Sequence, residues 1–325
     1  MTNAQERPLS LDRHPVTLRE YRIPTPTLEA FYLLIVRSLR FKIHGSIVYG
    51  RSRFGKSSGI DFLEQFLARK DKTLPLIKLA CQRKKTPSES AFLSNILSAA
   101  SHAATSGGTP SALRIRLINR LREIAERYNS NRIVLFADDA QRLAQIEYEW
   151  LQEIHDTLAR HRIALVSFLV GTPLLRGQKS LFQSQGEEQI VARFMVDELP
   201  FRGLLSAQDC ATCLTAYDET EEPPQSGWPY TRFFLHKAFD SGLRLGEEGA
   251  PAWDAFGDAH RQARLPGDVE IPMDYFTRAV EYILTEYVGQ DNDRFRLNRA
   301  IWDEAVKYSG FSHALELVSP GIIEP

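Results

Sequence analysis

The sequence is poor in cysteine and has no long apolar run. Only 3 of its 325 residues are cysteine, a number that argues against a disulfide-rich secreted fold and fits a reducing cytosol. No segment approaches the roughly 18 consecutive apolar residues that a membrane-spanning helix needs. Residues 1–14 contain no apolar core of the kind found in secretory signals, so we expect neither a signal nor a membrane partner.

Histidine and cysteine patterns that bind metals are also missing. The 8 histidines include no H-x-x-x-H pair, and Cys210 and Cys213 form a lone C-x-x-C. A zinc site would need a second pair at suitable spacing. We expect these two cysteines to pack in a core, with metal or redox use as the alternative.

The net charge of −1 conceals an uneven distribution of charge along the chain. Residues 1–60 carry 10 basic and 4 acidic residues, and residues 83–122 carry 7 basic residues and 1 acidic residue. Residues 218–258 hold 9 acidic and 3 basic residues. Either the protein has a basic and an acidic face, or these charges lie on solvated helix faces.

Apolar strand patterns alternate with helical patterns as far as residue 201. The pattern predicts strands at 46–49, 74–81, 132–140, 162–172 and 195–201, and helices at 28–40, 56–69, 87–104, 111–128, 144–160 and 187–194. This alternation is typical of an α/β fold with a parallel sheet covered by helices on both faces.

Two further parts flank this region. Four prolines punctuate residues 1–27, which we interpret as an extended arm, and residues 203–313 are mostly helical with Pro/Gly-rich loops at 222–229 and 246–251. We therefore predict an N-terminal arm at 1–27, an α/β nucleotide-binding domain at 28–202, and a smaller helical lid domain with a C-terminal tail at 203–325.

The segment GRSRFGKSSG, residues 50–59, follows the first predicted strand. Its Gly-x-x-x-x-Gly-Lys-Ser spacing is the P-loop pattern. The glycines let consecutive N–H groups face one anion, Lys56 adds a positive charge, and the Ser57 hydroxyl can ligate Mg²⁺. We predict that ATP binds through Gly50, Arg51, Ser52, Arg53, Phe54, Gly55, Lys56, Ser57 and Ser58.

A second nucleotide signature lies about 80 residues further on. Asp138 and Asp139 end the apolar run 133–137, and ligands of open α/β sheets bind at that edge. We predict that Asp138 holds Mg²⁺ together with Ser57 and that Asp139 polarises the attacking water. Glutamate is usual at the second position, so the shorter Asp139 predicts slow hydrolysis of ATP to ADP and phosphate.

Three more residues occupy positions that serve the nucleotide in AAA+ ATPases. Thr172 follows a predicted strand and is a candidate sensor of the γ-phosphate; the alternative is an ordinary turn before Pro173. Arg193 precedes the last strand and is a candidate arginine finger for a neighbouring subunit, with a surface ion pair as the alternative. Arg296 lies in 293–299, which we expect to open a helix, and is a candidate to reach the phosphates from the lid.

Four segments follow one another along the chain: IVYGRSRFGKSS, RIVLFADDAQRL, FLVGTPLL and ARFMVDELPF. Together they resemble the TnsC/TniB family of AAA+ regulators of multi-component DNA transposons. The resemblance covers about residues 28–202. The segment DDAQ departs from the family, in which many members have DEA followed by histidine or a similar residue.

This resemblance implies a bacterial, nucleoid-associated ATPase that assembles with ATP into rings or filaments around duplex DNA. Its partners would be further copies of itself, transposase subunits and a target selector of TniQ/TnsD type. DNA contacts in the family come from the stretch between the second and third strands, and would be independent of sequence. In this chain that stretch contains Arg83, Lys84, Lys85, Arg114, Arg116 and Arg120.

Two other functions remain open. A helicase loader or origin-type initiator would share the ATPase core and the basic segment, but we find no C-terminal DNA-reading domain or replisome-binding arm. A P-loop switch that does not act on DNA would make the basic stretch incidental. A gel shift with duplex DNA, with and without ATP, separates this last function from the others.

Overall fold

The computed structural model describes residues 7–313. Residues 28–201 form one compact unit, here called the α/β unit. The described residues before Leu28 and after Phe201 form a second, here called the helical unit. The predicted C-terminal tail from residue 314 onward lies outside the described residues.

The α/β unit is built on a five-stranded parallel sheet with the order β2-β3-β4-β1-β5. The strands are β1 (Gly45–Tyr49), β2 (Leu76–Ala80), β3 (Arg132–Asp138), β4 (Ala164–Gly171) and β5 (Asp197–Pro200). Because β1 lies between β4 and β5, the loop that follows β1 begins at the carboxyl edge of the sheet, one strand in from the outermost strand β5. That edge is where open parallel sheets bind ligands.

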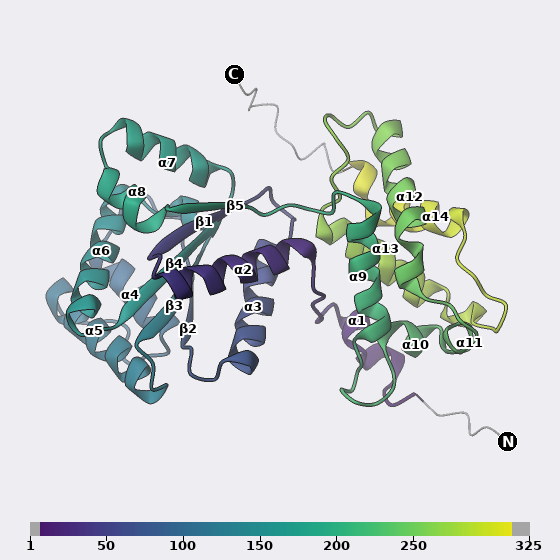
Figure 1. Cartoon of the computed structure of the whole chain (residues 1–325), viewed down its shortest axis with the longest axis horizontal. Coiled ribbons are helices and arrows are strands. Elements are labelled where there is room, and N and C mark those ends of the chain that lie inside the picture. The colour runs from purple at the N-terminus through teal and green to yellow at the C-terminus, as the bar shows by residue number, and fades with distance from the viewer. Residues whose placement is uncertain (1–6, 314–325) are drawn as a thin grey trace. The chain divides into compact units, whose positions relative to one another are not determined.

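Helices cover both faces of this sheet (Figure 1). One face packs against α2 (Pro26–Phe41) and α3 (Lys56–Lys70). The other packs against α4 (Glu89–Ala99), α5 (Pro110–Arg127), α6 (Gln145–Arg160), α7 (Leu174–Ser184) and α8 (Glu188–Phe194). Along β3, Val134 and Phe136 join the first core while Ile133 and Leu135 join the second, as expected of a strand buried on both faces.

These elements confirm the predicted α/β fold with a parallel sheet, and the sequence pattern missed only one α-helix of the unit, α7. Within α7 only Leu175 and Phe182 are buried, and Gly177 stands in its middle. The apolar residues of α7 come in two pairs, Leu174/Leu175 and Leu181/Phe182, separated by a polar stretch that contains this glycine, so the segment after Pro173 is easily taken for a turn and loop.

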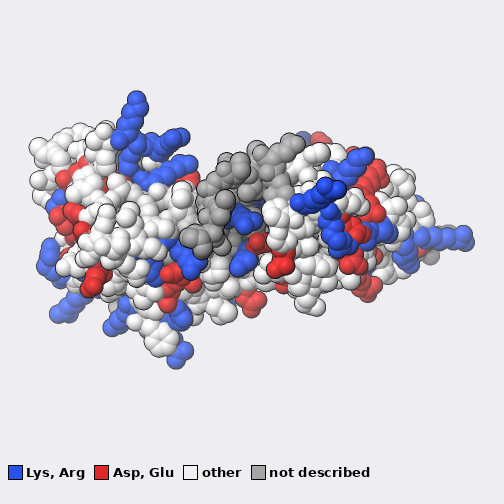
Figure 2. Space-filling view, turned by 90° about the horizontal axis from the view of Figure 1, so that it is seen from above, with Lys and Arg blue, Asp and Glu red and all other residues white. Residues whose placement is uncertain are grey.

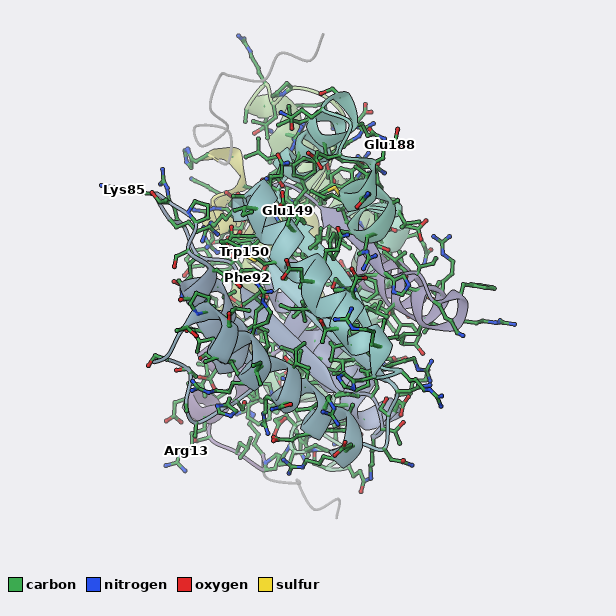
Figure 3. The ribbon with its side chains drawn as sticks, turned by 90° about the vertical axis from the view of Figure 1, so that its left-hand side faces the viewer. Arg13, Lys85, Phe92, Glu149, Trp150 and Glu188 are labelled. Atoms are coloured by element: carbon green, nitrogen blue, oxygen red, sulfur yellow. The ribbon has the colours of Figure 1, made fainter. Side chains whose placement is uncertain are left out.

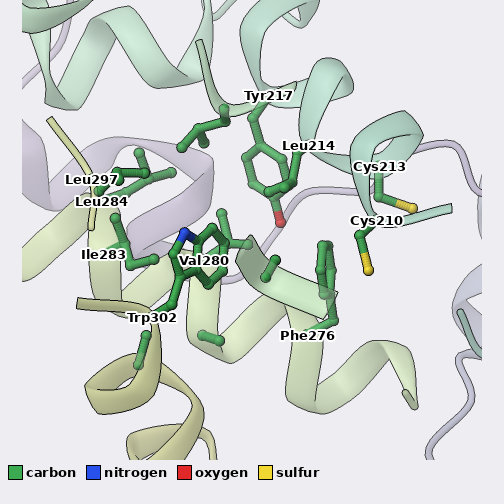
Figure 4. Packing of buried hydrophobic residues seen from close by; sticks show 14 of the residues in the cluster. Cys210, Cys213, Leu214, Tyr217, Phe276, Val280, Ile283, Leu284, Leu297 and Trp302 are labelled. Carbon is green, nitrogen blue, oxygen red and sulfur yellow. The ribbon is translucent and has the colours of Figure 1, made fainter. Parts of the chain in front are cut away.

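The helical unit has its own apolar core (Figure 4). Its α-helices are α1 (Pro15–Leu18), α9 (Ala207–Glu219), α10 (Tyr230–Phe234), α11 (His236–Asp240), α12 (Gly249–Gln262), α13 (Met273–Glu286) and α14 (Arg299–Ser309). Short 3₁₀ helices occupy Leu11–Arg13, Ala140–Arg142, Leu245–Glu248, Val288–Gln290 and Phe311–His313, the second of these in the α/β unit.

The extended N-terminal arm is a wrong prediction for residues 7–27. This segment contains α1 and packs into the core of the helical unit, where Val16 is buried. The Tyr21 hydroxyl lies 2.7 Å from the Tyr217 hydroxyl and donates to Glu281 Oε1 at 3.1 Å. The prolines keep the local helices short, but the apolar residues between them pack into the core and bury the segment.

Two local predictions in the helical unit are also wrong. The expected loop at 246–251 is a 3₁₀ turn followed by α12, because Gly249 packs closely against the Ala207 carbonyl and Ala211 of α9. The expected helix start at 293 lies at Arg299 instead, since the Asn298 side chain accepts a hydrogen bond from the Ile301 N–H and caps α14 there.

Within residues 7–313, no helix is long and apolar enough to cross a membrane.

Candidate nucleotide site

The segment between β1 and α3 adopts the geometry expected of a P-loop. Gly55 has φ 89°, a left-handed conformation that favours glycine, and α3 begins at the next residue, Lys56. The Lys56 Nζ donates to the carbonyls of Gly50 and Arg51, both at 2.7 Å. The lysine therefore folds back over the loop, and the N–H groups that open α3 have no intrahelical acceptor.

Glycine is needed at position 50 for a reason other than loop curvature. A Cβ on Gly50 would overlap the carbonyl oxygen of Phe201, the residue after β5. The Gly50 N–H also donates to the Gly171 carbonyl at 3.0 Å, and the Phe201 N–H donates to the Tyr49 carbonyl at 2.7 Å. Gly50 thus lets the ends of β4, β1 and β5 meet beside the loop.

Asp138 and Asp139 lie close enough to Lys56 for their charges to act on it. Burial lowers the pKa of Lys56, and the two carboxylates oppose this shift by raising it. Asp138 is the last residue of β3 and pairs in register with Val170 of β4 and Ala80 of β2. The fold thus brings together two motifs that are about 80 residues apart in the sequence.

Asp139 adopts a left-handed backbone conformation with φ 57°. Its carboxylate accepts a hydrogen bond from Gln141 Nε2 at 3.0 Å and pairs with Arg142 at 3.0 Å. Aspartate is among the non-glycine residues that adopt this conformation most readily. Asp139 is therefore held by its own loop, at the point where the chain leaves β3.

Thr172 directly follows β4 at the same edge of the sheet. Its backbone N–H donates to Gln141 Oε1 at 3.0 Å. Its buried Oγ1 has no hydrogen-bond partner within residues 7–313. An unsatisfied buried hydroxyl is costly, so a polar partner at this oxygen would stabilise the site.

These residues fit ATP and Mg²⁺. The helix N-terminus and Lys56 suit phosphate groups, and the unpartnered Thr172 Oγ1 would gain a partner. Ser57 is exposed and Asp138 is half-buried, so both oxygens are open to a hard cation. Two such oxygens suit Mg²⁺, which uses few protein ligands beside phosphate and water.

Arg193 lies at the opposite edge of the sheet from the P-loop. Its carbonyl is close to Gly45, which begins β1, and its guanidinium pairs with Asp156 of α6. The side chain remains 29% exposed. Arg193 is therefore not part of this subunit's own nucleotide site, and its role as an arginine finger for another subunit stays a prediction.

Arg296 is exposed in the loop before α14. Its guanidinium donates to the carbonyls of Asp293, Phe295 and Ser241, at 3.1, 2.7 and 2.9 Å. All these partners belong to the helical unit. Its role toward the nucleotide stays a prediction.

The six candidate DNA-binding residues fall into two groups. Four are engaged within the α/β unit: Lys84 pairs with the buried Glu147, and Arg114 pairs with Glu89 and Glu153. Arg116 and Arg120 donate to backbone carbonyls at the end of α4 and in the following loop. Arg83 and Lys85 are exposed in the loop between β2 and α4, and Lys85 extends from the margin of the molecule in Figure 3.

Charges of both signs lie on the face shown in Figure 2. They are mixed over much of that face, and one group of basic side chains projects at its upper left. On α4 and α6, Phe92 and Trp150 pack against one another with ring centroids 5.8 Å apart (Figure 3). Among the six candidate residues, Arg83 and Lys85 are the exposed ones, so the DNA prediction rests on the β2–α4 loop.

Cys210 and Cys213 are free and buried in the core of the helical unit (Figure 4). Burial raises the pKa of both thiols, that of Cys213 to about 12. Thiols in this state are poor nucleophiles and poor metal ligands, so both residues act as small apolar side chains.

Sequence reasoning gave no role to two residues that the fold places beside predicted site residues. Gln141 was visible only as a departure from a family pattern, and the structure places it between Asp139 and Thr172. Asp156, the partner of Arg193, is one acidic residue among several on an amphipathic helix. That departure was the only signal for Gln141, and Asp156 had none that separates it from an ordinary surface residue.

Comparison with known proteins agrees with this geometry. Residues 45–178 match a family model described as an AAA domain. No curated protein sequence matches the chain.

Solved structures provide a second comparison. The ORC2 protein of Aeropyrum pernix, solved as ADPNP–ADP complexes, is 15% identical, with a TM-score of 0.50 over 90% of this chain and 71% of that one. The ORC1 protein of the same organism, solved in complex with DNA, is 15% identical, with a TM-score of 0.49 over 91% and 68%. The first of these likenesses shows the fold alone, and the second is too low to support an argument.

The chain therefore has an AAA-type α/β fold with a P-loop, followed by a helical region.

Proposed function

We propose that this protein is an ATP-hydrolysing AAA+ switch that acts on duplex DNA. The ATPase activity is proposed because the fold brings Lys56, Asp138, Asp139 and Thr172 to the same edge of the sheet. In this proposal ATP supplies the phosphoryl group that is transferred to water. Lys56 exchanges its two carbonyl partners for phosphate oxygens. Ser57 and Asp138 would hold Mg²⁺, which would offset the negative charge of the phosphates.

The remaining residues of the site act on the water and on the terminal phosphate. The Asp139 carboxylate orients the attacking water and accepts its proton. The Thr172 hydroxyl, which is unpartnered within the described chain, donates to the terminal phosphate. Asp139 is one methylene shorter than the usual glutamate, so we expect slow turnover.

A helicase-loader or initiator-type ATPase is the first candidate for the biological role. What supports it is the fold likeness to the ORC2 protein, which extends over 90% of this chain. DNA contacts would come from the β2–α4 loop, whose exposed Arg83 and Lys85 suit phosphate groups.

A regulator of DNA transposition is the second candidate, favoured by the segments FLVGTPLL and ARFMVDELPF. In that role the protein would assemble as a ring or filament on DNA and contact transposase subunits and a target selector of TniQ/TnsD type. Electron microscopy with duplex DNA and a non-hydrolysable ATP analogue separates the two roles. Continuous helical filaments favour the transposition regulator, and discrete complexes favour the loader or initiator.

The ATPase assignment is tested by Lys56→Ala. Removal of this cation should abolish ATP binding, measured by calorimetry or by fluorescence of a labelled nucleotide. Lys72→Ala, which removes an exposed lysine after the far end of α3, is the matched control and should bind ATP normally. Near-parental affinity in Lys56→Ala would contradict the proposed site.

The DNA assignment is tested by a gel shift with duplex DNA. We expect the protein to bind in the presence of ATP and to bind much less without it. Absence of binding under both conditions would leave an ATPase switch that does not act on DNA.

A further inference from the structure

One side chain links the two strand ends that carry Asp139 and Thr172. Gln141 Nε2 donates to Asp139 Oδ1, and Gln141 Oε1 accepts from the Thr172 N–H, each at 3.0 Å. We propose that Gln141 is a positioning residue: it ties the Asp139 carboxylate to the Thr172 turn, so that Asp139 is aligned for catalysis when Thr172 engages the terminal phosphate. This inference rests on the proposed ATPase function.

Hydrogen-bond chemistry determines the orientation of the Gln141 amide. The Thr172 backbone offers a donor, so the atom that faces it must be the amide oxygen. The NH₂ group is then directed at the Asp139 carboxylate, which only accepts. With the amide reversed, two donors would face each other and two acceptors would face each other, so one arrangement alone satisfies both neighbours.

The surroundings of Gln141 leave it little freedom. A Cβ on Gly171 would overlap Gln141 Oε1 and would also lie 2.8 Å from Leu175 Cδ1. The Gln178 Nε2 donates to the carbonyls of Gln141 and Leu143, at 3.2 and 3.1 Å. Both the side chain and the backbone of Gln141 are therefore held by β4 and α7, the elements on either side of Thr172.

The other partner of Asp139 cannot provide the same control. Arg142 and Asp139 are 42% and 43% exposed, and exposed ion pairs contribute about 0–1 kcal/mol because water competes for both groups. Arg142 also donates to the Cys81 carbonyl at 3.2 Å, which directs it toward β2 and away from Thr172. Of the two partners, only Gln141 connects Asp139 to the turn after β4.

The main test is Gln141→Glu. This variant keeps an acceptor for the Thr172 N–H but places a second carboxylate against Asp139 in place of a donor. We expect kcat for ATP hydrolysis to fall by about tenfold or more, since small displacements of a catalytic group have large effects on rate. ATP affinity should stay within about threefold, because Lys56 and the P-loop are untouched.

Two further variants test the same inference by different changes to the hydrogen bonds of Gln141. Gln141→Met preserves the volume and removes both hydrogen bonds. Gly171→Ala leaves Gln141 in place but displaces its Oε1. Both should reproduce the fall in kcat with ATP affinity retained, and retained affinity also shows that the α/β unit is folded.

The matched control is Gln145→Glu, four residues along the chain. Gln145 Nε2 donates to Glu187 Oε1 at 2.8 Å, so this substitution creates the same repulsion outside the site. It should leave kcat unchanged. Because Gln141 acts through Asp139, the double variant Asp139→Asn/Gln141→Met should be no slower than Asp139→Asn alone.

The inference is overturned if Asp139→Asn is slow while Gln141→Glu and Gly171→Ala both hydrolyse ATP at the parental rate. It is also overturned if the Gln141→Met effect adds in full to that of Asp139→Asn. Parental turnover in Asp139→Asn itself would overturn the catalytic part of the proposed function, and the inference with it.

Discussion

His155 of α6 is a buried histidine that stays neutral in the folded α/β unit. Its Nε2 lies 3.0 Å from the Ser167 hydroxyl of β4, and its ring packs edge-on against Phe194. Burial lowers its pKa to about 3, with smaller contributions from His44 and Arg193. Protonation is therefore easier in the unfolded chain, where the pKa is near 6.5.

This difference predicts acid sensitivity. Between pH 6.5 and about 3 the unfolded chain binds a proton that the folded chain excludes, so stability is lost as the pH falls. From pH 6.5 to 5 the loss attributable to His155 should be about 1.5 kcal/mol. In the double variant His155→Leu/Ser167→Ala, which removes both polar groups, this loss should disappear when urea unfolding is compared at the two pH values.

The single variant Ser167→Ala is the control and should keep the parental pH dependence. His14 also has a pKa lowered by burial, to about 4, but its contribution is common to all three proteins. An unchanged difference between pH 6.5 and 5 in the double variant would show that His155 is not the group responsible.

At the scale of elements, the β2–α4 loop is the segment that we expect to hold DNA. Arg83 and Lys85 are exposed there, whereas Lys84 is paired with Glu147 at the start of α6. The double variant Arg83→Ala/Lys85→Ala should weaken duplex binding. It should also reduce the slope of log affinity against log salt by about 1.8 per subunit, the value for two lost phosphate contacts.

The double variant Arg69→Ala/Lys72→Ala is the matched control. It removes the same charge from exposed positions at and beyond the end of α3, at the opposite edge of the sheet. Its salt slope, measured by fluorescence anisotropy, should equal the parental slope. Equal slopes in both double variants would exclude the β2–α4 loop as the DNA contact.

At the scale of the whole molecule, the position of Arg193 predicts cooperation between subunits. Arg193 lies at the edge of the sheet away from its own P-loop and pairs with Asp156. An arginine finger acts on the nucleotide of a neighbour. Arg193→Ala and Lys56→Ala should each be nearly inactive alone, whereas their mixture should regain ATPase activity at sites that combine one intact residue from each variant.

A mixture of Lys56→Ala with Asp139→Asn is the control for this experiment, because no rescue is expected from it. In the proposed site Asp139 serves the nucleotide of its own subunit, so Lys56→Ala should not rescue it. If the Arg193→Ala mixture never exceeds the sum of its separate components, Arg193 is a structural ion-pair residue only.

The sequence by itself determined the sheet, most of its helices and the residues at its carboxyl edge. Buried parallel strands must be apolar throughout, and a P-loop needs particular residues at set spacing, so both leave a signal in consecutive residues. The Pro-rich segment 7–27 and the helix α7 were misjudged because local composition says little about burial against distant residues. Only the tertiary structure brought Gln141 between Asp139 and Thr172, and only it separated the exposed Arg83 and Lys85 from basic residues already paired within the unit. The physical reason is that a hydrogen bond or ion pair between residues far apart in the chain exists only once folding has placed both groups, and no spacing along the sequence records that distance.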